Sequence, residues 1–409
     1  MSKSEQEFTN TLYTNDNLFI LNGLNSNLVD LIYLDPPFNK NKIFSAPIGT
    51  KAAGTSFKDM WTWADVNEAY LEILADKYPA LAKFIGTVGG MHSKAMMAYL
   101  TYMSQRIIEM HRILKDTGSL YLHCDQTASH YLKILLDNIF GKNNFRNEII
   151  WCYKGASEAK ISFPRKHDVI LFYAKSQFTN FYYDNIRVPY KSNNSKPAKW
   201  KDGEHKKHPI GTKCLDWFAD IPSFMTASQS KERTGYKTQK PLALLKRIIK
   251  ASSNEGDIVM DPFCGCATTC VAAQQLGRKW IGIDLEKNAV GLLMNRLSDD
   301  ANIFDDFINP NVIPQRTDIK IEPPSQSVKE RLYKQQNRLC NACGLEFNIL
   351  NLEIDHIIPK SKGGGDYYEN YQLLCGSCNR IKGNRPMEYL RMKIETREKM
   401  LKNKIIFGE

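Results

Sequence analysis

The sequence predicts an α/β protein with a mostly parallel sheet, followed by a small C-terminal unit stapled by zinc. Short apolar strands alternate with amphipathic helices in two blocks of the chain, which is typical of parallel strands joined by crossover helices. Two Cys-x-x-Cys pairs, which begin at Cys340 and Cys375, can close one tetrahedral site of four thiolates. A proline-rich stretch between these parts, residues 309–328, predicts a linker.

The first block contains two predicted strands and two predicted helices. Residues 28–34 form an apolar run that Asp-Pro-Pro then ends, because proline cannot donate to a strand ladder. A helix is expected over residues 95–114, where apolar side chains recur at helical spacing. A second strand is expected at residues 119–123 and a second amphipathic helix at residues 127–140.

The strand–helix rhythm is lost over residues 151–235 and then resumes. That segment is rich in Lys, Ser, Asn, Tyr and Pro, so irregular strands and loops are expected there. A helix is predicted from Pro241 to Ile249. The remaining predicted elements are a strand at 257–260, a turn at 262–267, a helix at 268–276 and a strand at 279–283.

The net charge of +11 is concentrated in two segments. Residues 151–240 carry +9 with aromatic side chains interleaved, and residues 325–409 carry +5. A bound polyanion explains this distribution, and we prefer nucleic acid to a merely solvated lysine-rich surface. No apolar run is long enough to span a membrane, and the first residues lack the apolar core of a signal peptide. We therefore expect a cytoplasmic protein with no membrane partner.

A candidate ligand site lies in MDPFCGCATT, residues 260–269. A strand enters a turn of small residues there and a helix leaves it, so the backbone can approach a ligand and offer free N–H groups. Asp284 ends the next strand, where its carboxylate can grip the two hydroxyls of a ribose. Such a glycine turn is weak evidence by itself. Three cysteines crowd this turn, but no histidine or further pair accompanies them, so small residues filling a turn are preferred to a second metal site.

Together with LIYLDPPFN at residues 31–39, this turn resembles the β group of the amino-methyltransferases of DNA. The resemblance covers roughly residues 10–300 and includes GSLYLHCDQTASHYLK, TQKPLALLKRIIKASSN and WIGIDL. It implies a Rossmann-like fold, S-adenosylmethionine as methyl donor, and adenine N6 or cytosine N4 as target. The DPPF motif precedes the cofactor motif, and the basic segment between them matches the family's target-recognition region. Asp-Pro alone normally marks a strand-ending turn, and the second motif outweighs that interpretation.

The resemblance assigns roles to the residues of both motifs. Asp35 and the backbone carbonyl of Pro36 would accept the hydrogens of the target amine, with Pro37 fixing the carbonyl and Phe38 stacking on the extruded base. The cofactor contacts implied are Asp261, Phe263, Gly265, Thr268, Asp284 and, at the methionine end, Lys240. Ala267 replaces the last glycine of the family pattern, and we expect only a tuned cofactor site.

Adenine N6 is preferred as the target because Asp35 begins the motif where cytosine-N4 members more often have Ser. Cytosine N4 stays the alternative. His123 and Asp125 are expected at a strand end beside the catalytic loop, where they are as readily explained as ordinary strand-end polar residues.

The C-terminal motifs resemble the HNH nucleases, in which a zinc-stapled ββα unit hydrolyses a phosphodiester. Four thiolates leave no open position for water, so the zinc would be structural. Its ligands are Cys340, Cys343, Cys375 and Cys378. The resemblance implies that His356 is the general base, that Asp355 and Asn379 hold one Mg²⁺, and that Asn370 braces the loop of His356. Asn379 stands where some members have His. Lys382 and Arg385 are expected to touch phosphates.

These motifs predict a single-chain restriction–modification enzyme that methylates adenine N6 and cuts double-stranded DNA. Its parts are expected at residues 1–150 (catalytic part), 151–240 (target recognition), 241–308 (cofactor part), 309–328 (linker) and 329–409 (HNH nuclease). A double-strand cut by one HNH unit would favour a homodimer. The alternatives are a cytosine-N4 enzyme, a methyltransferase whose zinc module only binds DNA, and, less favoured, an RNA substrate.

Overall fold

An eight-stranded sheet forms the centre of the computed structural model, with strand order β1-β12-β11-β2-β5-β7-β6-β10. The strands are β1 (Thr11–Thr14), β2 (Val29–Leu34), β5 (Leu114–Cys124), β6 (Phe145–Cys152), β7 (His167–Ala174), β10 (Trp217–Phe218), β11 (Ile258–Asp261) and β12 (Lys279–Asp284). All neighbouring pairs are parallel except the two that involve β7, which is antiparallel to β5 and β6. The predicted mostly parallel sheet is confirmed.

The structure describes residues 10–38, 42–45, 56–59, 74–75, 77–155, 159–190, 199–200, 203–204, 208–224, 230, 232–236, 238–286, 288–298, 307–385, 387, 389–391, 393–394 and 396. Much of the lysine-rich part of the basic segment, including residues 191–198, lies outside these ranges. In the described part of the chain, no helix is long and apolar enough to cross a membrane.

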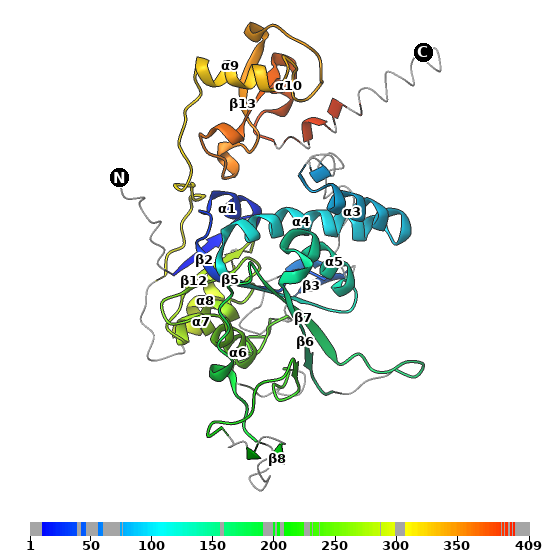
Figure 1. Cartoon of the computed structure of the whole chain (residues 1–409), viewed down its shortest axis with the longest axis vertical. Helices are drawn as coiled ribbons and strands as arrows, with labels where there is room; N and C mark the ends of the chain where they lie inside the picture. The colour runs from blue at the N-terminus through cyan, green and yellow to red at the C-terminus, as the bar shows by residue number, and fades with distance from the viewer. Residues whose placement is uncertain are drawn as a thin grey trace.

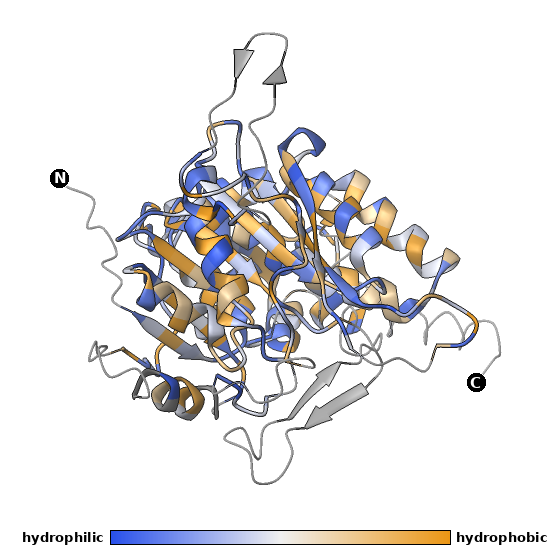
Figure 2. Cartoon of the chain, turned by 90° about the horizontal axis from the view of Figure 1, so that it is seen from below, coloured by the Kyte–Doolittle hydropathy of each residue, from blue (hydrophilic) through white to orange (hydrophobic). Residues whose placement is uncertain are grey.

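Helices cover both faces of the sheet because its strands are apolar on both sides (Figure 1). One face packs against α1 (Asn17–Gly23), α4 (Lys94–Ile113) and α5 (Ser129–Phe140), and α3 (Pro79–Met91) packs against α4 and α5. The other packs against α6 (Leu242–Ser252), α7 (Thr268–Gln275) and α8 (Asn288–Ser298). Successive side chains of β5 alternate between the two cores: Leu120 and Leu122 face the first, and Tyr121 faces the second. Figure 2 shows hydrophobic residues gathered in the strands and their covering helices.

The expectation of irregular structure throughout residues 151–235 is wrong for one part of that segment. Residues 167–174 form β7, which lies between β5 and β6 inside the main sheet. Tyr173, one of the aromatic residues taken as a sign of nucleic-acid binding, is fully buried there. Besides β10, the other described residues of the segment hold short elements only: η3 (Tyr183–Ile186), β8 (Lys199–Trp200) and β9 (Gly203–Glu204). Elsewhere, β3 (Lys42–Ser45) and β4 (Ser56–Asp59) pair as an antiparallel hairpin, and η2 (Lys142–Asn144) precedes β6.

The C-terminal unit has its own core and a ββα arrangement, with an extra helix before it (Figure 1). Its elements are α9 (Gln326–Gln335), η4 (Ile349–Asn351), β13 (Leu352–His356), η5 (Lys360–Lys362), η6 (Tyr368–Asn370), β14 (Tyr371–Cys375) and α10 (Gly376–Lys382). The antiparallel register of β13 and β14 places His356 opposite Tyr371 and Leu352 opposite Cys375. The pair therefore carries the Asp-His motif at one end and the second cysteine pair at the other.

Candidate active sites

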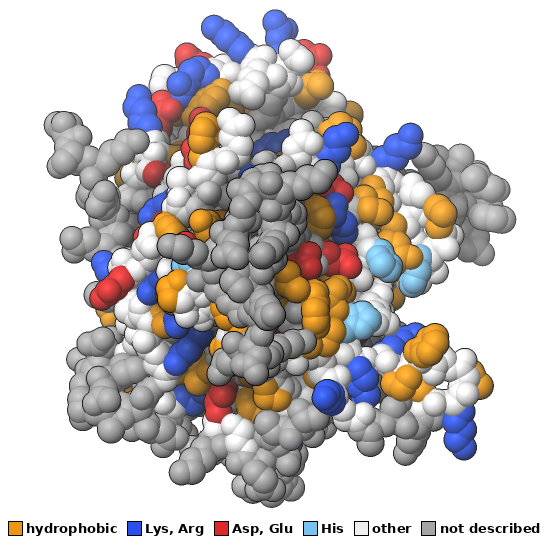
Figure 3. Space-filling model, turned by 60° about the horizontal axis from the view of Figure 1, so that its bottom comes forward, with side chains coloured by type: hydrophobic (Ala, Val, Ile, Leu, Met, Phe, Trp, Pro, Cys, Tyr) orange, Lys and Arg blue, Asp and Glu red, His pale blue; other side chains and the backbone are white. Residues whose placement is uncertain are grey.

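A cavity of about 910 Å³ opens where the carboxyl ends of β2, β11 and β12 meet. Parallel strands bring their ends to the same edge of a sheet, so motifs distant in sequence converge there. All ten methyltransferase residues predicted from sequence line it: Asp35, Pro36, Pro37, Phe38, Lys240, Asp261, Phe263, Gly265, Thr268 and Asp284. Figure 3 shows one face of the molecule, on which a small group of acidic side chains lies beside hydrophobic and histidine side chains.

The turn between β11 and α7 has a backbone that favours glycine. Gly265 has φ +51, and a Cβ there would lie 3.2 Å from the ring of Tyr236. Ala267 also adopts the left-handed conformation, with φ 57, and this explains why a glycine suits that position. For alanine the conformation costs roughly 1–2 kcal/mol. The turn is therefore strained at Ala267, and its backbone lies close to the cavity at the carboxyl ends of the strands.

Two buried carboxylates hold this turn and its surroundings. Asp261 accepts from the hydroxyl of Thr269 at 2.5 Å and from the N–H of Phe263 at 3.0 Å. Asp284 accepts from the N–H of Gly265 at 2.7 Å. Burial raises the pKa of Asp261 to about 7 and that of Asp284 to about 6. Asp261 therefore holds the turn in place through its hydrogen bonds, whereas Asp284 lies at the end of β12 and lines the cavity.

The part of the cavity formed by the β11–α7 turn and Asp284 offers hydrogen-bonding groups that suit S-adenosylmethionine. Asp284 offers carboxylate oxygens at the place where a ribose would be gripped. The small-residue turn leaves a cradle that a side chain at Gly265 would begin to fill. The first turn of α7 adds backbone N–H groups. These residues would hold the nucleoside part of the cofactor.

Asp35 has one oxygen engaged and one free in the described structure. Its Oδ2 accepts from Lys240 Nζ at 2.5 Å, and the two side chains are only 15% and 10% exposed. Its Oδ1 is buried and has no hydrogen-bond partner among the described residues. The ammonium of Lys240 also lies 5.6 Å from the ring centre of Phe38. Lys240, expected at the methionine end of the cofactor, is thus in contact with the DPPF motif.

A buried polar chain, of which sequence reasoning singled out only His123, supports Phe38 from the side away from the cavity. His123 bonds Tyr33 through Nδ1 at 2.8 Å and Asp168 through Nε2 at 3.1 Å, and Tyr153 donates to Asp168 at 3.1 Å. The imidazole stacks on Phe38 with ring centres 6.2 Å apart. Burial would raise the pKa of Asp168, but the hydrogen bond and charge of His123 outweigh it and lower that pKa to about 2. The network fixes the ring on which a base would stack.

His123 and Asp125, predicted together, have different surroundings. Asp125 accepts from the N–H of Thr127 at 2.9 Å, which is an ordinary turn at the strand end. His123 is fully buried behind the cavity. Its partner Asp168 comes from β7, and no local spacing in the sequence links the two.

The four cysteines predicted to bind zinc are clustered in the C-terminal unit. The sulfur atoms of Cys340, Cys343, Cys375 and Cys378 all lie within 4.8 Å of one another. Four thiolates at this separation fit a tetrahedral zinc ion. Within the described ranges, no other group of three or more Cys, His, Asp or Glu side chains is arranged to hold a metal.

His356 is oriented by Asp366, a residue absent from the sequence prediction. His356 Nε2 lies 2.9 Å from Asp366 Oδ1, to which Tyr371 also donates at 3.0 Å, while Lys360 donates to Oδ2 at 2.6 Å. Burial opposes ionisation of Asp366, but hydrogen bonds from Lys360 and His356 outweigh it and lower its pKa to about 2. Asp366 follows three consecutive glycines, and an acid in such a loop could have been singled out as a partner for the histidine.

Asn370 ties the loop after His356 into one conformation. Its side chain accepts from the N–H of Ile358 at 2.8 Å and donates to the carbonyls of Ile358 at 3.0 Å and Gly365 at 3.1 Å. A Cβ on Gly364 would lie 1.8 Å from the carbonyl of Ile358, so only glycine permits this close crossing. The amide therefore contacts the loop that it was predicted to brace.

Asp355 pairs with the buried ammonium of Lys382, and the expectation that Lys382 touches phosphates is therefore wrong. Lys382 is 1% exposed and lies 3.1 and 3.0 Å from the two oxygens of Asp355. It also donates to the backbone carbonyl of His356 at 2.7 Å, so it does not reach phosphates. Arg385 is exposed and stacks on Tyr389.

Asp355 and Asn379, the predicted Mg²⁺ ligands, offer oxygen atoms that suit the ion, although Lys382 neutralises part of the charge of Asp355. Asp355 also accepts from Gln372 at 2.8 Å, and the amide nitrogen of Asn379 donates to Glu353 at 2.5 Å. Among the described residues, Oδ1 of Asp355 is contacted by Lys382 alone and retains a lone pair, and oxygen donors suit Mg²⁺. Asp355 and Asn379 would hold the ion, with Lys382 offsetting part of the charge that attracts it.

Comparison with known proteins identifies both units. The family described as DNA methylase, of the N6/N4 type, matches residues 29–295, and the family described as HNH endonuclease matches residues 340–385. The chain belongs to the N6/N4 DNA methylase family. Its C-terminal unit is an HNH domain.

Two relatives illustrate the match. Type II methyltransferase M.BglII from Bacillus subtilis is 27% identical over 323 residues, covering 77% of this chain and 76% of the relative. DNA adenine methyltransferase YhdJ from Escherichia coli (strain K12) is 28% identical over 298 residues, covering 70% and 82%. Among solved structures, the cytosine-N4-specific PvuII DNA methyltransferase is 11% identical with a TM-score of 0.43, covering 75% of this chain and 96% of that one.

Proposed function

We propose that the chain methylates adenine N6 in double-stranded DNA, using S-adenosylmethionine, and cuts DNA at its HNH site. The observation that carries the first half is the unpartnered Oδ1 of Asp35, buried in the cavity that Asp284 also lines. A buried acceptor without a donor costs about 1–3 kcal/mol, so it marks a place where a substrate donor is expected. The amine of a flipped base is such a donor.

The geometry of the DPPF motif accounts for activation of the amine. Lys240 holds Oδ2 of Asp35, which leaves Oδ1 to accept one amine hydrogen. The carbonyl of Pro36 would accept the other. Two acceptors draw the nitrogen toward tetrahedral geometry and localise its lone pair for attack. S-adenosylmethionine, when bound, supplies the methyl group. The stack of His123 on Phe38 keeps the base-binding ring in place.

The choice of adenine rests on Asp35 at the head of the motif and on similarity to a relative named as an adenine methyltransferase. Plasmid DNA methylated by the purified chain should yield N6-methyladenine on nucleoside mass spectrometry. N4-methylcytosine in its place would overturn the adenine assignment and leave the methyltransferase assignment standing.

The binding of S-adenosylmethionine should weaken below pH 6. Asp284 must be ionised to accept from both ribose hydroxyls, and burial raises its pKa to about 6. The ligand therefore binds the deprotonated form, so its affinity should fall about tenfold for each pH unit below that value. Calorimetric titrations between pH 5 and 8 would measure this. The Asp284→Asn variant should bind weakly at every pH; an unchanged pH dependence in it would assign the effect to another group.

For the nuclease half, we propose His356 as general base, oriented by Asp366. A water activated by His356 would attack a phosphodiester whose charge is offset by Mg²⁺ on Asp355 and Asn379. The zinc ion on the four cysteines would be structural. A plasmid methylated beforehand should resist cleavage in Mg²⁺ if both activities share one recognition sequence, and equal cutting of methylated and naive plasmid would contradict self-protection.

Replacing Asp366 with Asn should slow cleavage by about 10- to 100-fold. In this proposal the carboxylate orients the imidazole and does not contact DNA, so DNA binding should be unchanged. Plasmid nicking in Mg²⁺ and a DNA-binding titration measure the two effects. Glu369→Gln, an exposed acid in the same loop, is the matched control and should behave like the wild type. Parallel losses of cleavage and of DNA binding would mean that Asp366 serves the fold alone.

A second candidate function is an HNH domain that binds DNA without cutting it. It is favoured by one observation: Lys382 already neutralises Asp355, which weakens the attraction for Mg²⁺. If the wild-type chain and its His356→Ala variant bind DNA equally and neither cuts in Mg²⁺, this alternative is correct.

A further inference from the structure

We propose that the HNH domain is fastened to the methyltransferase in one orientation, so that DNA is cut at a constant distance from the methylated base. The fastening consists of residues 308–322, called here the strap, and the loop of residues 359–366. This inference rests on the proposed nuclease function and specifies the geometry of its product.

The strap begins as part of the methyltransferase sheet. Ile308 donates its N–H to the carbonyl of Asn10 at 2.9 Å, and Leu12 donates to the carbonyl of Ile308 at 2.9 Å. Ile308 thereby pairs with the edge strand β1 in the parallel sense. The chain leaving the methyltransferase is held by backbone bonds up to this point, so its starting direction is fixed.

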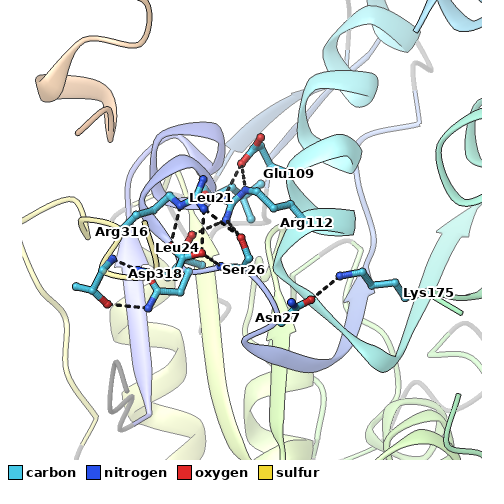
Figure 4. A network of polar contacts seen from close by, with 11 residues as sticks. Leu21, Leu24, Ser26, Asn27, Glu109, Arg112, Lys175, Arg316 and Asp318 are labelled. Atoms are coloured by element: carbon cyan, nitrogen blue, oxygen red, sulfur yellow. Dashed lines mark hydrogen bonds and ion pairs between the residues drawn. The ribbon is translucent and has the colours of Figure 1, made fainter. Parts of the chain in front are cut away.

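The middle of the strap binds the loop that follows α1 (Figure 4). Asp318 accepts from the N–H of Ser26 at 2.9 Å, and Asn25 accepts from the N–H of Thr317 at 2.8 Å while donating to its hydroxyl at 2.8 Å. Arg316 donates to both oxygens of Asp318 and to the hydroxyl of Ser26. The side chains of Arg316 and Asp318 are only 15% and 20% exposed. This is a specific polar interface, whereas a flexible tether would leave these groups in water.

The surface beneath the strap is itself held rigidly. Arg112 of α4 donates to the carbonyls of Leu21 and Leu24 at 2.8 Å each, and pairs with Glu109 at 2.7 Å (Figure 4). These bonds satisfy carbonyls at the end of α1 and tie that helix to α4. The docking surface therefore moves with the methyltransferase core.

The far end of the strap is bonded to the nuclease loop. Glu322 donates its N–H to the carbonyl of Asp366 at 2.8 Å, and the hydroxyl of Tyr371 lies 3.0 Å from the carbonyl of Glu322, which shares the single hydroxyl proton with Asp366. Asp366 and Tyr371 are the residues that surround His356. The strap therefore connects the residues beside His356 directly to the surface of α1.

The nuclease loop also contacts α1 itself. Asn22 donates to the carbonyl of Lys362 at 3.4 Å, and the ammonium of Lys362 lies 5.2 Å from the ring centre of Phe19. A Cβ on Gly363 would lie 2.4 Å from the carbonyl of Phe19. Two separate contacts, by the strap and by the loop, restrict rotation of the domain about either one.

The strap approaches α1 most closely at Gly23, so a substitution there tests the docking. A Cβ on Gly23 would lie 1.8 Å from the backbone carbonyl of Pro314, so Gly23→Ala should lift the strap. A Cβ on Gly86, in α3, meets nothing within 4 Å, and Gly86→Ala is the matched control. Neither glycine lines the methyltransferase cavity, so both variants should methylate DNA normally.

The first readout is amide hydrogen exchange, which needs no nuclease activity. In the wild type and in Gly86→Ala, the amides of Ser26 and Thr317 should be protected. In Gly23→Ala their exchange should be at least about tenfold faster. If Gly23→Ala fails to fold, the Arg316→Ala/Asp318→Ala double variant replaces it. Its control is Arg338→Ala/Glu346→Ala, an exposed ion pair within the HNH domain.

The second readout is the position of the DNA ends, mapped by sequencing after cleavage in Mg²⁺. Wild type and controls should cut at one narrow offset from the methylated base, and the strap variants should give ends spread over several base pairs. Unprotected Ser26 and Thr317 in the wild type would refute the docking. Scattered wild-type ends with protected amides would refute the constant offset. Protected amides with no cleavage by any variant would refute the nuclease assignment and, with it, the offset.

Discussion

Replacing Asp35 with Ala should nearly abolish methyl transfer to DNA, with kcat falling by about 10³-fold or more. The substitution removes the unpartnered acceptor that the amine is expected to meet, and it leaves the ammonium of Lys240, which is 10% exposed, without its carboxylate. Incorporation of a radiolabelled methyl group into duplex DNA measures the loss. Binding of S-adenosylmethionine should persist, because Asp261 and Asp284 hold the other half of the cavity.

Two further variants separate chemistry from folding in this prediction. Asp116→Ala removes a carboxylate that is 74% exposed and outside the cavity, and it should methylate normally. Asp35→Asn keeps the shape and one acceptor oxygen, so it should fold with Lys240 in place and still lose most of its activity. Wild-type incorporation by Asp35→Ala would refute the assignment of the DPPF motif.

The strands around the methyltransferase cavity could be predicted from sequence because each is a short apolar run that ends in a polar motif. The run predicted at residues 28–34 is β2, and that at residues 279–283 is β12. In contrast, β7 was missed although HDVILFYA, residues 167–174, is itself an apolar run. The composition of the long basic segment around it obscured an eight-residue strand whose apolar faces both pack in the core.

Among the site residues, those in a local sequence motif could be predicted, whereas those that depend on a partner far away in the sequence could not. Asp35 could be chosen because its motif resembles that of a known family, and Asp284 because it ends the strand that follows the glycine turn. Asp168 and Lys382 could not, because each acquires its role from a partner on another element. Lys382 looked like a phosphate contact from its charge alone, yet the fold buries it against Asp355. An internal cation is a property of packing that a one-dimensional pattern does not contain.

Removing zinc should unfold the HNH domain and abolish cleavage while methylation continues. Cys340, Cys375 and Cys378 are buried within a small core, and the four sulfurs approach within 4.8 Å of one another. Without a cation, four close thiolates would repel, and a unit of this size lacks the core to compensate. Structural zinc contributes about 10–16 kcal/mol to comparable small domains, far more than a domain's usual margin of stability. The two cores of the methyltransferase share no residue with that of the HNH domain, so they should survive.

The purified chain should therefore contain one zinc ion, and Cys378→Ser should lose it together with all cleavage. Cys152→Ser, which alters a half-buried cysteine of β6, is the matched control and should retain both. A zinc-selective chelator in excess Mg²⁺ should reproduce the variant's behaviour, because it removes the structural ion and leaves the catalytic one. Limited proteolysis after chelation should then digest the C-terminal residues and spare the methyltransferase. Cleavage that survives loss of zinc would show that the fold of the nuclease site does not depend on the four thiolates, and it would separate the metal from the activity.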